Sequence, residues 1–72
     1  MSGLSAEALQ DYTVVVTINP ADSIAVNSIG TILANLGRLS EALPFFEQAA
    51  KLDNRDAQHA AVQVRRELGL TT

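Results

Sequence analysis

Apolar residues recur at intervals of three and four along much of the chain, which is the spacing of amphipathic helices. The clearest such segment, residues 22–37, begins at Asp22, a favourable N-cap residue, and ends at Gly37, which suits the position after a helix. A second segment follows over residues 39–54, where the hydroxyl of Ser40 can cap the helix start. The pattern predicts a helix in each segment.

A third helix is predicted over residues 56–69, with Asp56 near its N-terminus and Gly69 at its end. Its apolar stripe consists of Ala57, Ala60, Ala61, Val64 and Leu68. The loops between these helices hold only a few residues, so neighbouring helices are expected to pack antiparallel. In the second helix Glu47 and Lys51 are four residues apart, a spacing at which an ion pair adds slight support.

The start of the chain is ambiguous by local preference, because the valine-rich run over residues 14–18 is β-branched and favours a strand. Shifting the sequence along itself by 34 residues bears on this question. The matched residues are then Gly3 with Gly37, Glu7 with Glu41, Ala8 with Ala42, Leu9 with Leu43, Tyr12 with Phe46, Ile18 with Leu52 and Asp22 with Asp56. Because repeat context overrides a weak local propensity, we predict a helix over residues 5–18.

The 34-residue period of paired helices resembles the tetratricopeptide repeat. Residues 23–56 supply the residue types of that pattern at Val26, Ile29, Gly30, Leu33, Gly37, Ala42, Phe46, Ala49 and Asn54. Val26 stands where Trp is usual, and Asn54 stands where Pro is usual. Small residues such as Gly30 are needed where paired helices approach closely, while larger ones such as Phe46 fill the space beside them.

The resemblance implies an all-α fold, a solenoid fragment of about four antiparallel helices in a single domain over residues 1–72. Residues 1–22 correspond to the second helix of a partial repeat, and residues 23–56 correspond to a complete repeat. Residues 57–72 depart from the pattern where a Leu-Gly pair is expected, which suits a C-terminal capping helix.

A polar and uncharged stripe follows the first helix of the complete repeat. Asn27, Thr31 and Asn35 lie at positions i, i+4 and i+8 of a helix that is otherwise almost wholly apolar. They resemble the groove-lining residues of tetratricopeptide repeats, where an amide holds the backbone of a bound peptide, and Gln58 and Arg65 are expected to extend this concave face. The resemblance implies a non-catalytic scaffold that binds a peptide or protein. A merely solvated stripe is the alternative.

The first helix has no preceding neighbour in its repeat, and repeats normally need roughly three units for stability. Its apolar residues are therefore expected to leave an exposed patch made of Leu9, Tyr12, Val15, Val16 and Ile18. Such a patch marks an interface. An alternative function is thus that of a self-associating structural unit, which forms a homodimer or a higher homo-oligomer. The other explanation of the patch is that the chain is a fragment of a longer parent protein.

Composition narrows the classes of partner. The 72 residues carry a net charge of −3 with every base in the second half, so a basic face for nucleic acid is missing. Cysteine is absent, which excludes disulfides and thiolate metal sites, and no apolar run reaches the roughly 18 residues of a membrane span. The first ten residues lack the features of a signal peptide, so a cytoplasmic location is expected.

One short motif supports a remote alternative. Asp22-Ser23-Ile24 at a helix start resembles the Asp-Ser-Leu of acyl carrier proteins, whose serine carries phosphopantetheine. The motif lies too early in the chain, the long loop that precedes it in those proteins is absent, and the self-match at 34 residues stays unexplained. Asp22 as an N-cap is the simpler interpretation, and no cofactor is expected.

No group of residues in the sequence predicts catalysis. His59 is the only histidine and has no second histidine or cysteine with which to share a metal. Glu7 and Glu41 match across the repeat, which indicates a role near helix starts rather than an acid–base pair. The protein is therefore not expected to be an enzyme.

Overall fold

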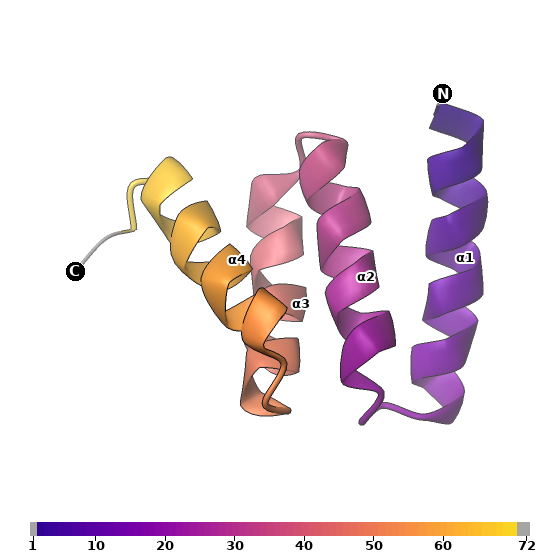
Figure 1. Cartoon of the computed structure of the whole chain (residues 1–72). Coiled ribbons are helices and arrows are strands. Elements are labelled where there is room, and N and C mark those ends of the chain that lie inside the picture. The colour runs from indigo at the N-terminus through magenta and orange to yellow at the C-terminus, as the bar shows by residue number, and fades with distance from the viewer. Residues whose placement is uncertain (1, 71–72) are drawn as a thin grey trace.

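The computed structural model describes residues 2–70, with side chains from residue 5 onward, and forms four α-helices within that range (Figure 1). They are α1 (Ser2–Ile18), α2 (Ser23–Asn35), α3 (Leu39–Lys51) and α4 (Arg55–Glu67). No strand occurs in the described range, so the all-α prediction is confirmed and the valine-rich run is helical. Each helix runs antiparallel to the one before it, as the short loops predicted (Figure 1).

Asp22 and Asn54 supply the side-chain caps of α2 and α4. The Asp22 carboxylate accepts a hydrogen bond from the N–H of Ala25 at 3.1 Å, as predicted, and the Asn54 amide oxygen accepts one from the N–H of Ala57 at 2.9 Å. Each bond satisfies a backbone donor that a helix start leaves unpaired. With Asn54 as its cap, α4 begins at Arg55, one residue before the start expected at residue 56.

The other two helix starts differ from the expectation. α1 begins at Ser2 instead of residue 5. α3 begins at Leu39, so Ser40 lies inside the helix, and the expected Ser40 cap is wrong. Instead, the guanidinium of Arg38 in the N-cap position donates to the Glu41 carboxylate, with 2.9 Å between Nη2 and Oε1. This pair holds an acid in the first turn, where a carboxylate suits the helix dipole.

Helices α2, α3 and α4 end in the same kind of turn. The residue after each C-cap has a positive φ, namely 78° at Gly37, 67° at Asp53 and 74° at Gly69. In the first of these turns the N–H of Arg38 donates to the carbonyl of Leu33 at 2.9 Å, which is the long hydrogen bond of a Schellman motif. The two predicted helix-ending glycines are therefore confirmed, while Asp53 adopts the same conformation with a side chain.

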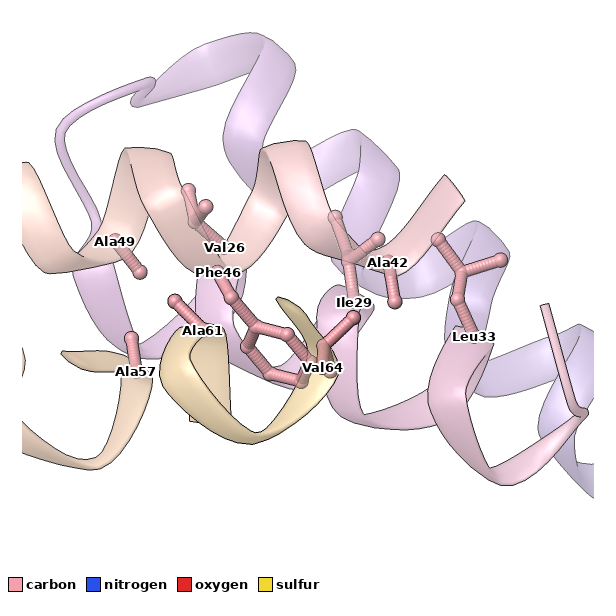
Figure 2. Packing of buried hydrophobic residues seen from close by; sticks show 9 residues of the cluster. All are labelled: Val26, Ile29, Leu33, Ala42, Phe46, Ala49, Ala57, Ala61 and Val64. Carbon is pink, nitrogen blue, oxygen red and sulfur yellow. The ribbon is translucent and has the colours of Figure 1, made fainter. Parts of the chain in front are cut away.

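The core lies between α2, α3 and α4 (Figure 2). It consists of Val26, Ile29, Leu33, Ala42, Phe46, Ala49, Ala57, Ala61 and Val64. Phe46 is its one large aromatic residue, 3% exposed, and its ring extends from α3 toward Val64 of α4 (Figure 2). A Cβ placed on Gly30 of α2 would lie 2.8 Å from the ring of Phe46. The predicted close approach of the paired helices is confirmed at this contact.

Helix α1 lies at the edge of the array and has its extensive contacts with α2 alone (Figure 1). Leu9, Tyr12 and Val16 pack against the core and are partly buried. None of the α1 side chains that the structure describes is fully buried. This helix is therefore the most loosely covered element of the described chain.

Candidate interaction surfaces

The polar stripe of α2 reaches the surface. Thr31 and Asn35 are exposed, whereas Asn27 is partly buried. The Thr31 hydroxyl donates to the carbonyl of Asn27 at 3.0 Å, so its proton is engaged within the helix. The Oδ1 atom of Asn27 is buried and has no hydrogen-bond partner among the described residues, a condition that costs about 1–3 kcal/mol. Asn27 thus carries a hydrogen-bonding capacity that the fold leaves unmet.

Gln58 and Arg65 line an open depression of about 460 Å³ between α3 and α4. Its full lining is Glu47, Ala50, Lys51, Gln58, Ala61 and Arg65. The Nε2 atom of Gln58 donates to the carbonyl of Ala50 at 3.4 Å, and the Arg65 guanidinium pairs with the Glu47 carboxylate. These two contacts tie α4 to α3 at the surface of the molecule.

The ion pair of Glu47 differs from the one that the sequence spacing predicted. Glu47 binds Arg65 of α4 and makes no ion pair with Lys51, its expected partner in α3, within the described chain. A guanidinium offers a planar fork of donors that matches a carboxylate better than an ammonium does. Both partners are more than a third exposed, so this pair adds little to stability. Lys51 also lines the depression, to which it contributes a positive charge.

The five predicted partner-binding residues therefore fall on two surfaces. Asn27, Thr31 and Asn35 follow α2, and none of them lines the depression that holds Gln58 and Arg65. The 34-residue shift explains part of this division, because it matches Arg65 with Thr31 but matches Gln58 with Ile24, outside the stripe.

Sequence reasoning missed the contribution of α3 to the depression, which is made by Glu47, Ala50 and Lys51. A signal was present, because these residues occupy one face of α3 at helical spacing. Their approach to α4 depends on how the two helices cross, which no local pattern encodes. A second depression, of about 300 Å³, was also missed. It is lined by Val16, Pro20, Val26, Pro44, Phe45 and Gln48, none of which is charged.

The residues weighed as catalytic or metal-binding candidates, His59, Glu7 and Glu41, do not form a shared site in the described chain. His59 and Glu7 are exposed, and no group of three His, Cys, Asp or Glu residues in the described chain is placed to hold a metal ion. The hydrogen bond from Arg38 lowers the pKa of the Glu41 carboxyl and, with the attraction between the two charges, raises the pKa of Arg38. Glu41 thus makes a local contact at the start of α3.

Ser23, the residue of the carrier-like motif, is the first residue of α2 and is partly buried. Its carbonyl accepts a hydrogen bond from the Asn54 amide at 3.4 Å, which joins the start of α2 to the loop before α4. The neighbouring Asp22 acts as the cap of α2, so Asp22 and Ser23 each have a structural role.

Among the described helices, none combines the length and the hydropathy that crossing a bilayer requires. The chain matches no protein-family model, and no curated protein or solved structure matches it.

Proposed function

We propose that the chain is a non-catalytic protein-interaction module of the tetratricopeptide-like type, which binds a peptide or an extended segment of another protein. The observation that carries this proposal is the polar, uncharged stripe on α2, in which the buried Oδ1 of Asn27 has no partner. Its binding surface comprises the stripe and the depression between α3 and α4.

The stripe offers what an extended backbone needs. Such a segment presents N–H and C=O groups that must find partners on binding, and the exposed amide of Asn35 can donate and accept at once. At Asn27 a rotation of the side chain would bring the buried oxygen within reach of a bound N–H. The bound state then gains a hydrogen bond that the free chain does not make, at no cost in buried charge.

The stripe is also held in place by the core behind it. Ile29 and Leu33 of the same helix are 2% and 5% exposed, and Gly30 is in contact with Phe46. A surface fixed in this way loses little conformational entropy when a partner binds, and this favours affinity. The packing of the apolar face of α2 therefore fixes the polar stripe in the position from which it would bind a partner.

The depression adds a charged contact. Lys51 and Arg65 are positively charged residues of its lining, and the Arg65 guanidinium is already hydrogen-bonded to Glu47. A partner segment with an acidic side chain would be attracted to Lys51 and could share the donors of Arg65. We therefore expect partners with at least one carboxylate beside an extended, largely uncharged stretch.

Selection of peptides from a random display library against the chain tests this proposal. Selected peptides should lose affinity by about tenfold or more toward the double variant Asn27→Ala/Asn35→Ala, while its far-UV circular dichroism stays that of the parent. The matched control is Gln10→Ala/Gln63→Ala, which removes two exposed amides from α1 and α4 and should bind as the parent does. Equal binding by both double variants, or no selected peptide at all, would contradict the proposal.

A further inference from the structure

The outer side of α1 carries a stripe in which acidic and apolar residues are segregated. Glu7, Asp11, Val14 and Ile18 are all exposed and lie at positions i, i+4, i+7 and i+11, which share one side of a helix. The first two are acids, and the last two are 58% and 80% exposed. The C-terminal half of this stripe, flanked by Val15, is an apolar face of a helix that contacts α2 on its other side.

Equivalent residues are less buried in α1 than in α3, because α1 packs against fewer neighbouring helices. Helix α3 packs against both α2 and α4, and its residues Ala42, Phe46 and Ala49 are buried. The residues 34 positions earlier are Ala8 and Tyr12, which are partly buried, and Val15, which is 38% exposed. α1 is thus an element of the same kind with one neighbour missing. An apolar face left open in this way marks an interface.

We infer that a second copy of this chain covers that face, with the two α1 helices packed antiparallel about a two-fold axis near Val14 and Ile18. This arrangement places the Val14 of one copy against the Ile18 of the other. It also places Glu7 and Asp11 of one copy at one end of the contact and those of the other copy at the opposite end, so that these four acids do not face one another. Antiparallel helices also align their dipoles favourably. The inference is independent of the peptide-binding function, because it uses no residue of that surface.

The two ends of the molecule differ in a way that favours this pairing over end-to-end stacking. The exposed side of α4 carries Arg55, Asp56, Arg66 and Glu67. Packing α1 of one copy against it would take several charges out of water, which is costly unless each finds a partner. Packing α1 on α1 buries apolar groups on both sides. A two-fold contact also closes, so it yields a dimer and no filament.

The size of the face sets the expected strength of the contact. Three apolar residues per copy are fewer than the 20–30 residues of a standard interface, so we expect a dissociation constant on the order of 100 micromolar. Sedimentation equilibrium of the whole chain from about 10 micromolar to about 1 millimolar covers that range. The expected result is a monomer–dimer equilibrium without larger species.

The position of the contact can be tested by replacing one of two exposed valines, one on α1 and one on α4, with glutamate. Val14→Glu on α1 should weaken dimerisation by about tenfold or more, whereas Val62→Glu on α4, where the valine is 44% exposed, should leave it unchanged. Circular dichroism checks that both variants keep their helices. A monomer at every concentration, larger assemblies, or equal dimerisation by the two variants would overturn the inference.

The orientation can be tested by cross-linking, because the chain has no cysteine of its own. An equimolar mixture of Val14→Cys and Ile18→Cys chains should form mixed disulfides faster than a mixture of Ile18→Cys and Val62→Cys chains. Faster cross-linking of the second mixture would indicate α1 packed on α4 and would overturn the two-fold arrangement. These outcomes do not depend on whether the chain binds peptides.

Discussion

Gly30 and Phe46 are in such close contact that a Cβ on the glycine would lie 2.8 Å from Cε1 of the ring and 2.9 Å from Cδ1. Real side chains do not approach to that distance, so α2 and α3 can pack at this spacing only with a glycine at residue 30. The ring has little freedom to move away, because Phe46 is 3% exposed within the core.

Gly30→Ala should therefore destabilise the fold although alanine is the better helix former. The intrinsic preference favours alanine by about 1 kcal/mol, while overpacking a core costs about 1–3 kcal/mol. We expect a net loss of stability, measured as a lower midpoint of urea unfolding. Ser28→Ala in the same helix, whose hydroxyl bonds only the carbonyl of Ile24, is the control and should be neutral or slightly stabilising. A Gly30→Ala variant more stable than the parent would show that the helices separate at little cost.

Asp53 offers a stabilising substitution. It has a φ of 67° at the end of α3, a conformation that favours glycine, and its negative charge lies near the unfavourable end of the helix dipole. Asp53→Gly should raise the free energy of unfolding by about 0.5–1 kcal/mol. A decrease in stability would mean that the Asp53 side chain makes a contact worth more than the strain.

The converse substitution at Gly37 isolates the backbone effect. A Cβ there would meet nothing within 4 Å, so Gly37→Ala changes only the cost of the positive φ. We expect this variant to lose about 1 kcal/mol in urea unfolding, and Gly37→Asn to lose less, because asparagine tolerates this conformation. Equal stability of all three proteins would contradict the argument.

Asn54 has two separable roles. Its amide oxygen caps α4, and its Nδ2 donates to the carbonyl of Ser23 across to α2. Asn54→Asp keeps the cap and loses the second bond, whereas Asn54→Ala loses both. We expect a loss of about 1 kcal/mol for the alanine variant and a clearly smaller one for the aspartate variant, both by thermal unfolding. If the two losses were the same, the bond to Ser23 and not the cap would dominate.

The ion pair of Glu41 with Arg38 predicts a pH dependence of known sign. The guanidinium hydrogen bond lowers the pKa of Glu41 in the folded state, so the folded state binds this proton less readily than the unfolded state does. The ionised pair therefore stabilises the fold above the ordinary pKa of glutamate. That contribution disappears as the pH falls through the lowered pKa of the folded chain.

Because both side chains are half exposed, the effect on stability is small, and the titration itself is the better measurement. Carboxyl NMR should show a pKa of Glu41 below its usual range in the parent chain and closer to that range in Arg38→Gln. An identical Glu41 titration in the two proteins would show that the pair does not form in solution.

The helical architecture could be predicted from the sequence because several signals agreed. The apolar spacing around Phe46, the glycines at 37 and 69 and the match of Tyr12 with Phe46 all favoured helices, so the β preference of the valine-rich run was overridden. The start of α3 could not be predicted in this way. A helix start depends on competing caps, and Ser40 had the right chemistry but lies two residues after Arg38, which occupies the N-cap position.

The candidate surfaces were predictable to different degrees. The stripe of Asn27, Thr31 and Asn35 follows from spacing within one helix, and the structure places all three along α2. The depression around Arg65 joins two helices, and its pairing with Glu47 depends on their crossing. The exposed apolar face of α1 also differs from the expected patch. Leu9, Tyr12 and Val16 pack against the core, and this packing depends on how α1 lies against α2. Val14 is exposed at 58% instead.

The central claim is that the surface of α2, with the depression between α3 and α4, binds a partner segment. The most direct test is a ¹H–¹⁵N NMR titration of the labelled chain with a peptide obtained by display selection. The account predicts concentration-dependent shifts at the backbone and side-chain amides of Asn27, Asn35 and Gln58 and at the backbone amides of Thr31 and Arg65. Shifts confined to α1, or none at all, would contradict it.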